Sequence, residues 1–363
     1  MKKKYLLLGL VVICLIIFGF SLVNRGNSTT KKRTVYAVLP LTGALADVGN
    51  IYKNVIEMYL RDHNASFDVK FIDSEYNPAK ALSAVRQSCV MEENPILVTA
   101  ITAISTGITS GMQNGFVISI STVETEKLSS FKNEQRISTT SVDGLPSLVE
   151  YLAKKGIKTV SIINPNNDYG LVAKKYFSKH CLLHGIEVKS AEIYSIQDTD
   201  MRDLVGKLLR IDSDAIFVTG AATPAFINIF KELRSKEYKG VIVGDEALGL
   251  PSVQRALWGD LNGLIFPGFD VSLDNPKTEK SRAFRAKCLA NKIQPDILAI
   301  ETYDTMLIID HFIKNGLPFK RESFLSMKSF NGISGDIEFI AGGNCKYHFT
   351  PIKMDENRMV LAK

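Results

Sequence analysis

The sequence contains little that would indicate a metal centre, a redox site or a nucleic-acid partner. Its five cysteines form no CxxC pair, which argues against a zinc site and a redox motif. It has one tryptophan, and 44 Lys and Arg residues stand against 38 Asp and Glu residues. Seven of the basic residues lie in the first 33 positions, so the remainder is close to neutral and carries no nucleic-acid footprint.

Motifs of the common enzyme classes are also missing. The chain has no Walker A motif and no GxGxxG motif, and residues 107–111 (GITSG) do not form a GxSxG elbow. His180 and His184 are four residues apart, but no glutamate follows His180, so the HExxH zinc motif fails and an exposed helix end is the favoured interpretation. We therefore predict that the protein is not an enzyme and that it needs neither a metal nor a cofactor.

Four cysteines follow the first 33 residues: Cys89, Cys181, Cys288 and Cys345. They are far apart in the sequence, and their spacing does not require disulfides. Two disulfides are an alternative in an oxidising compartment, whereas buried free thiols are the favoured interpretation.

The N-terminus has the features of a membrane-targeting segment. Three lysines precede an uncharged apolar run of 19 residues, 5–23. That run is longer than the usual core of a signal peptide, and its only small-x-small site, 19–21, lies inside the run, so an uncleaved anchor is favoured over a cleaved signal peptide. Cys14 follows Ile13 rather than a small residue, which argues against lipidation. Residues 24–32 are polar and indicate a tether, and we expect the body to be extracytoplasmic.

Strand and helix patterns alternate through the body of the chain. Short apolar strands are expected at residues 35–39, 67–72, 96–101, 116–120, 159–163, 186–194, 215–219 and 240–243, with helical patterns between them. Such alternation predicts an α/β protein with doubly wound parallel sheets. The last hundred residues contain two helical patterns and two antiparallel strands, 332–340 and 345–354, around the turn 341–344. They are too few for a third domain, so we expect them to complete the first two.

Several segments, in their order and spacing, resemble one family. The PLTG turn at 40–43, the DYG step at 168–170, the strand end VGDE at 243–246 and the GISG turn at 332–335 carry the resemblance, which covers about residues 34–355. The chain resembles the type I periplasmic solute-binding proteins, in the leucine/isoleucine/valine-binding branch of ABC transporter receptors.

This resemblance implies two Rossmann-like lobes joined by three crossover hinge strands. After an N-terminal segment of residues 1–33, lobe 1 is expected to comprise residues 34–140 and 268–346, and lobe 2 residues 141–267 and 347–363. A ligand would bind between the lobes, at the carboxyl ends of the strands, and would stabilise the closed state.

In lobe 1 the resemblance implies two ligand-binding turns. The first is formed by Thr102, Ala103, Ser105 and Thr106, where hydroxyls and backbone N–H groups would bind a ligand carboxylate at a helix start. Ala103 replaces the family's main serine, and Ser105 or Thr106 could instead only cap the helix.

The second turn contains Ser121, Thr122 and Glu124. Glu124 stands where the family has a hydroxyl residue, although a slip of one residue would put Thr125 there. A carboxylate in the cleft would repel a ligand carboxylate and favour a cationic ligand, such as an amine. The alternative is that Glu124 is exposed or begins a helix.

In lobe 2 the resemblance points to Tyr169, Asp245 and Glu246. Glu246 corresponds to the acidic residue that pairs with a ligand ammonium, Asp245 is the alternative if the register slips, and Tyr169 is a pocket tyrosine or a packing residue. Ala221 and Ala222 stand where a second aromatic residue is expected, which changes the pocket and puts a branched-chain amino acid ligand in question.

The expected function is therefore capture of a small polar solute, an amino acid, amide or amine, for the permease of an ABC importer. A membrane-tethered sensory ectodomain that signals to a membrane partner is the alternative, and a ligand-free envelope protein on the same fold is the third possibility.

Overall fold

The computed structural model describes residues 32–43, 45–120, 126–140 and 142–363, of which residues 34–363 form one compact unit. The expected anchor at 5–23 and the expected site residues Ser121, Thr122 and Glu124 lie outside the described residues. Within the described part of the chain, no helix combines the length and the apolar character that crossing a membrane requires.

The first sheet has the strand order β2-β1-β3-β4-β5, and β1, β3, β4 and β5 run parallel. Its strands are β1 (Arg33–Leu39), β2 (Phe67–Asp73), β3 (Ile96–Ala100), β4 (Phe116–Ile120) and β5 (Glu134–Arg136), and the helices along this part of the chain are α2 (Ala46–Asp62), α3 (Pro78–Ser88), α4 (Thr102–Gly111) and α5 (Glu126–Ser130). Strands β3 and β4 are buried along their whole length, as expected for apolar runs inside a parallel sheet.

The second sheet has the strand order β15-β14-β10-β9-β8-β6-β7. Its parallel strands are β6 (Thr159–Pro165), β7 (Glu187–Tyr194), β8 (Ala215–Val218), β9 (Val241–Gly244) and β10 (Ile265–Gly268), and the helices here are α6 (Leu145–Lys154), α7 (Asp168–Leu183), α8 (Arg202–Leu209), α9 (Pro224–Ser235), η1 (Glu246–Gly249) and α10 (Pro251–Ala256). Two antiparallel strands, β14 (Thr350–Asp355) and β15 (Arg358–Leu361), extend it beyond β10.

The segment between β10 and β14 forms helices and a third, small sheet. Its elements are η2 (Asp270–Ser272), α11 (Glu279–Ala290), α12 (Ile297–Lys314), α13 (Arg321–Met327), β11 (Ser329–Asn331), β12 (Asp336–Ile340), η3 (Ala341–Gly343) and β13 (Asn344–Tyr347), and the three strands pair antiparallel. The prediction of one strand over 345–354 was wrong. The chain instead forms β13 and β14 in different sheets, because Tyr347 packs in one hydrophobic core and Ile352 in another.

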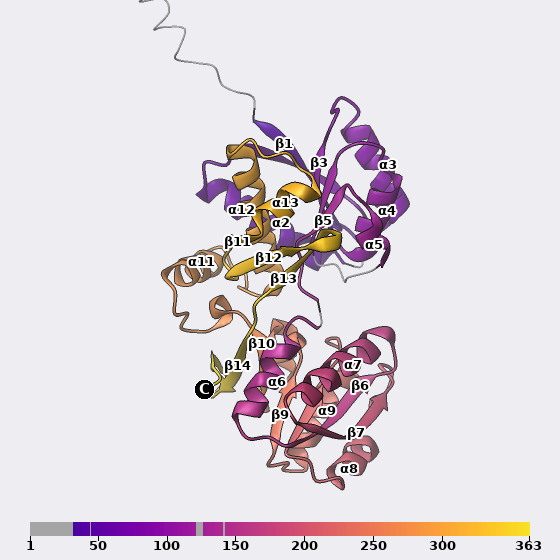
Figure 1. Cartoon of the computed structure of the whole chain (residues 1–363), viewed down its shortest axis with the longest axis vertical. Helices are drawn as coiled ribbons and strands as arrows, with labels where there is room; N and C mark the ends of the chain where they lie inside the picture. The colour runs from indigo at the N-terminus through magenta and orange to yellow at the C-terminus, as the bar shows by residue number, and fades with distance from the viewer. Residues whose placement is uncertain (1–31, 44, 121–125, 141) are drawn as a thin grey trace, which may run out of the picture. The chain divides into compact units, whose positions relative to one another are not determined.

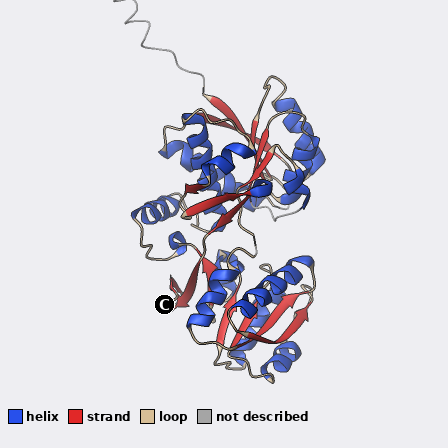
Figure 2. Cartoon of the chain, viewed as in Figure 1, coloured by secondary structure: helices blue, strands red, loops and turns tan. Residues whose placement is uncertain are grey.

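Helices cover both faces of each large sheet (Figure 2). In β1, alternate side chains point to opposite faces: Val35 and Ala37 pack with residues of α2 and α12, whereas Tyr36 and Val38 pack with α3 and α4 (Figure 1). The second sheet is covered in the same way, by α6 and α7 on one face and by α8 and α9 on the other.

The last hundred residues contribute to two cores. The core of the first sheet includes Phe284, Tyr303 and Phe324 from α11–α13, whereas the core of the second sheet includes Ile352 and Met354 from β14. The chain therefore passes between the two sheets three times, after β5, after β10 and after β13.

The four described cysteines are free and buried, which confirms the prediction of free thiols. Burial raises the pKa of each thiol, to about 12 for Cys181, Cys288 and Cys345 and to about 11 for Cys89. Their thiolate forms are therefore scarce at neutral pH, and these residues act as small apolar core groups.

Candidate functional site

A cavity of about 290 Å³ lies where the first crossing meets the carboxyl ends of the second sheet's strands. One wall is the crossing segment itself, residues 138–140. A second wall comes from the loops after β6, β8 and β9, through Tyr169 and residues 220–222, 246, 247 and 250. The third wall is the start of α12, at residues 297, 298 and 301. Open α/β sheets bind ligands at this end of their strands.

Glu246 and Asp245 are neighbours with different environments. Glu246 lines the cavity and is half-buried. Asp245 is fully buried behind the wall, where its Oδ2 accepts hydrogen bonds from the Thr219 hydroxyl at 2.7 Å and from the Gly220 amide at 2.8 Å. Its Oδ1 accepts from the amide of Ala247 at 3.2 Å and so caps η1. The structure thus turns Glu246 toward the cavity and assigns Asp245 to the scaffold.

The two carboxyl groups hold their protons more strongly than exposed ones do. Burial raises the pKa of Asp245 to about 6, against the hydrogen bonds that favour its ionised form. Burial also raises the pKa of Glu246 well above its usual range, and the negative charges of Asp245, Asp143 and Glu301 raise it further. The cavity wall is therefore electronegative, and a positive ligand group would relieve the repulsion.

Tyr169 is positioned by a helix start and by Asp245. The Asn167 side chain caps α7 by accepting from the Gly170 amide at 2.9 Å, which fixes the first turn. The Tyr169 hydroxyl then donates to Asp245 Oδ2 at 2.9 Å, while the ring lines the cavity. Asp245 therefore orients a tyrosine that lines this cavity.

Glu301 lines the cavity and was not among the expected site residues. It projects from α12 with 2% of its surface exposed. Its Oε1 accepts from the Thr139 amide at 2.6 Å and from the Thr139 hydroxyl at 2.7 Å, so it fastens α12 to the crossing segment. A carboxylate inside the apolar stretch ILAIETY was the signal in the sequence, since such a residue is rarely buried without a specific role.

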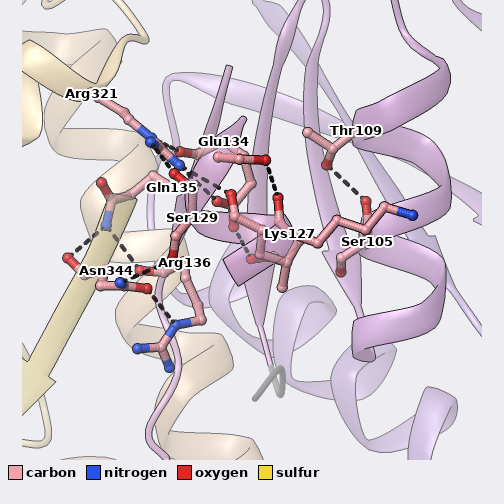
Figure 3. A network of polar contacts seen from close by, with 12 residues as sticks. Ser105, Thr109, Lys127, Ser129, Glu134, Gln135, Arg136, Arg321 and Asn344 are labelled. Atoms are coloured by element: carbon pink, nitrogen blue, oxygen red, sulfur yellow. Dashed lines mark hydrogen bonds and ion pairs between the residues drawn. The ribbon is translucent and has the colours of Figure 1, made fainter. Parts of the chain in front are cut away.

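A polar network holds the strand that leads into the crossing segment (Figure 3). Arg321 of α13 donates from Nε to the carbonyl oxygen of Glu134 in β5 at 2.7 Å. Arg136, at the end of β5, donates from Nε to Asn344 Oδ1 at 3.1 Å and from a terminal nitrogen to the carbonyl oxygen of Ser138 at 2.8 Å. Ser138 is one of the cavity residues, so this network fixes where the cavity wall begins.

The expected turn at the start of α4 does not contribute to this cavity. Helix α4 begins at Thr102, with Ile101 in the N-cap position at a φ of 74°, and Ala103 is exposed in the first turn. Ser105 is buried and shares a 2.8 Å hydrogen bond with the Thr99 hydroxyl.

The alternative that Ser105 or Thr106 caps α4 is wrong, because both lie inside the helix and no side chain caps it. In the second sheet's half of the site, Ala221 and Ala222 do line the cavity, so small side chains occupy the place where the resemblance implies an aromatic ring.

Comparison with known protein families identifies the family to which this chain belongs. A family model for periplasmic binding proteins matches residues 34–346. The chain belongs to the periplasmic binding protein family. Members of this family are substrate-binding receptors, not enzymes. A search of curated proteins gives no match.

Solved structures share the fold of this binding protein. A branched-chain amino acid transporter substrate-binding protein from Streptococcus pneumoniae, in complex with isoleucine, has a TM-score of 0.72 at 18% identity, over 92% of this chain and 99% of that one. A leucine-binding protein from Thermotoga maritima has a TM-score of 0.71 at 17% identity, over 91% and 98%. A solute-binding protein of an ABC transporter from Rhodopseudomonas palustris, in complex with 3,4-dihydroxybenzoic acid, has a TM-score of 0.71 at 16% identity, over 90% and 95%.

These TM-scores show that the chain has the type I periplasmic binding protein fold. The solved relatives bind different solutes, so the fold does not give the ligand of this binding protein.

Proposed function

We propose that this protein is an extracytoplasmic receptor that captures a small amino-bearing solute, an amino acid, amide or amine, for an ABC importer. The observation that supports the proposal is the cavity that Glu246 and Tyr169 both line. A half-buried carboxylate beside a tyrosine suits an ammonium group, because a charge-assisted hydrogen bond there is stronger than a neutral one.

The proposal divides the body into lobe 1, residues 34–140 and 268–346, and lobe 2, residues 141–267 and 347–363. The three crossings between the sheets support this division. Since the cavity has walls from the first crossing and from both lobes, a ligand in it would contact each lobe and stabilise the closed arrangement. The lobe 1 turn at Thr102, Ala103, Ser105 and Thr106 would then approach the ligand on closure, together with Ser121, Thr122 and Glu124.

The test is calorimetric melting of the full chain, purified in detergent, against amino acids, amides, amines and aromatic acids. A ligand of the folded state raises the free energy of unfolding by RT ln(1 + [L]/Kd), about 2.7 kcal/mol at one hundred times Kd. We expect an amino-bearing compound to raise the melting temperature and Glu246→Ala to remove the effect. A response to aromatic acids alone, or an undiminished response in Glu246→Ala, would contradict the proposal.

A membrane-tethered sensory ectodomain is the second candidate. The observation that favours it is the apolar run of residues 5–23, which is long for a signal-peptide core. Retention of this run in the mature protein, measured by intact mass, would favour the sensor, whereas its removal would favour a released receptor.

A further inference from the structure

Two threonines of the first crossing line the cavity, and a carboxylate binds each of them in the same way. Glu301 Oε1 accepts from the Thr139 amide at 2.6 Å and from the Thr139 hydroxyl at 2.7 Å. Asp143 accepts from the Thr140 amide at 2.8 Å through Oδ2 and from the Thr140 hydroxyl at 2.7 Å through Oδ1. Because a hydroxyl group has one proton, each threonine oxygen has only lone pairs left for a ligand.

The other two hydroxyl groups among the described lining residues are oriented in the same sense. The Tyr169 hydroxyl donates to Asp245 Oδ2 at 2.9 Å. The Ser138 hydroxyl lies 3.2 Å from the carbonyl oxygen of Thr139 and 3.5 Å from Glu301 Oε2, both of which are acceptors. The hydroxyl groups of the wall therefore present lone pairs to the cavity.

Backbone and side-chain N–H groups add few donors to this wall. The amides of Gly220 and Ala247, which line the cavity, donate to Asp245. Among the described lining residues, no side chain carries an N–H group. Arg136 is 2% exposed and is not part of the lining, and one of its terminal nitrogens donates to the carbonyl oxygen of Ser138. The side chains of the wall thus offer hydrogen-bond acceptors, whatever the sum of the charges around it.

We infer that the hydroxyls of Thr139 and Thr140 determine ligand specificity, by accepting hydrogen bonds from an ammonium or amidinium group that Glu246 also binds. Glu301 and Asp143 act as positioning residues, since they hold the two hydroxyl protons. The inference rests on the proposed function and adds the contacts that select its ligand class. A ligand carboxylate is rejected at this wall, because it would face lone pairs and the Glu246 carboxylate.

The experiment compares two pairs of compounds by titration calorimetry on the full chain in detergent. Benzamidine and benzoate have the same shape but present donors and acceptors, respectively. Leucinamide and leucine share the ammonium group, and only leucine has a carboxylate. Since a hydrogen bond to a charged group is worth about 1.5–3 kcal/mol, we expect benzamidine and leucinamide to bind at least about tenfold more tightly than their counterparts.

The outcomes separate this inference from the receptor function. A carboxylate compound that binds as tightly as its counterpart would overturn the inference and leave the receptor function intact. If the melting panel yields another ligand, that ligand and its analogue with the opposite group, amine or carboxylate, form the pair that decides. If no compound of the panel binds, both proposals are wrong.

Asp143→Asn tests whether the carboxylate sets the polarity of Thr140. The asparagine side chain can accept from the Thr140 amide and donate to the hydroxyl oxygen, which releases the hydroxyl proton toward a ligand. We expect tighter binding of benzoate and a preference for benzamidine that falls about fivefold or more. A damaged fold would not produce such a gain. Asp198→Asn is the matched control and should leave both affinities unchanged, since Asp198 is exposed and accepts from the amide of Ser195, also three residues before it.

Asp143→Asn also removes a negative charge, and a double variant with Thr140→Val separates this effect from that of the hydroxyl. We expect the gain in benzoate affinity to be at least about twofold smaller when the hydroxyl is absent. An equal gain in both backgrounds would mean that charge alone selects the ligand, and would overturn the inference.

A second position covers the case in which Asp143→Asn does not fold. Thr139→Val removes the hydroxyl and keeps the size of the side chain, whereas Thr139→Ser keeps the hydroxyl. We expect the valine variant to bind benzamidine about tenfold more weakly and the serine variant to retain most of the affinity. Equal affinities of the two variants would contradict the role of the hydroxyl.

Discussion

Tyr169→Phe removes a single hydroxyl, and its effect tests how Asp245 is held. In the wild type this hydroxyl donates to Asp245 Oδ2 at 2.9 Å, beside the bonds from Thr219 and Gly220. Phenylalanine keeps the ring and adds no atom, so the substitution removes this hydrogen bond and leaves the packing of the ring in place. A hydrogen bond to a charged group contributes about 1.5–3 kcal/mol, so we expect the free energy of unfolding at pH 7.5 to fall by about 2 kcal/mol. The melting temperature of the unit formed by residues 34–363 would fall by roughly 3 °C.

The pH dependence of this destabilisation follows from the raised pKa of Asp245. Its folded-state pKa is about 6, above the ordinary value of 3.8, so the folded protein holds this proton more tightly than the unfolded chain. The contribution of Asp245 to stability is therefore present below about pH 4 and is lost as the pH rises toward 6. The Tyr169 hydrogen bond limits that decline, because it favours the ionised form. Tyr169→Phe should thus cost more at pH 7.5 than at pH 5.

The assay is urea unfolding at pH 5 and pH 7.5, followed by circular dichroism. Tyr176→Phe is the matched control, since Tyr176 lies on the same helix and is 42% exposed. A change below about 0.5 kcal/mol at both pH values, as expected for an exposed residue, would refute the role of the hydroxyl. A larger destabilisation at pH 5 than at pH 7.5 would refute the reasoning about charge.

Three further predictions concern titration and backbone packing. Burial and the neighbouring negative charges raise the pKa of Glu246, and its carboxyl group must lose its proton to pair with a cation, so the affinity for an amine should increase as the pH rises. Calorimetry at a constant salt concentration measures this increase, and an affinity that does not change with pH contradicts it. Burial raises the pKa of Glu134 to about 7, so the contribution of this group makes the free energy of unfolding decline as the pH rises from about 4.5 to 7. Glu134→Gln should make that decline shallower in urea titrations at several pH values. An unchanged dependence of the unfolding free energy on pH would contradict this prediction. Gly332→Ala would place a Cβ 2.3 Å from Asp304 Oδ1 and should lower the free energy of unfolding by about 1–3 kcal/mol. The control Gly206→Ala, in α8, meets no atom within 4 Å and should raise the free energy of unfolding by about 0.5–1 kcal/mol. Equal unfolding midpoints for the two variants would contradict this prediction.

The sequence predicts the strands of both sheets and most of the helices. Apolar runs such as 96–101 and 116–120 are unfavourable when exposed to water and must be buried. They therefore identify strands β3 and β4 directly. Boundaries are harder to predict because they depend on partners: the expected strand over 345–354 divides between two sheets where the chain crosses from one core to the other.

Only part of the candidate site can be predicted from the sequence. Glu246 and Tyr169 follow strand ends, and the resemblance to a family places them near a ligand. The sequence offers no means to choose between Asp245 and Glu246, because adjacent side chains separate only when the backbone turns into η1 and one of them meets Thr219 and Gly220.

The sequence by itself therefore determined the α/β class, the family and the presence of an acidic pair, Asp245 and Glu246, directly after β9, since these depend on local patterns and on their order. Only the tertiary structure decided that Glu301 of α12 lines the same cavity as Glu246. The physical reason is that α12 packs on the first sheet while β9 belongs to the second, so no local pattern connects them.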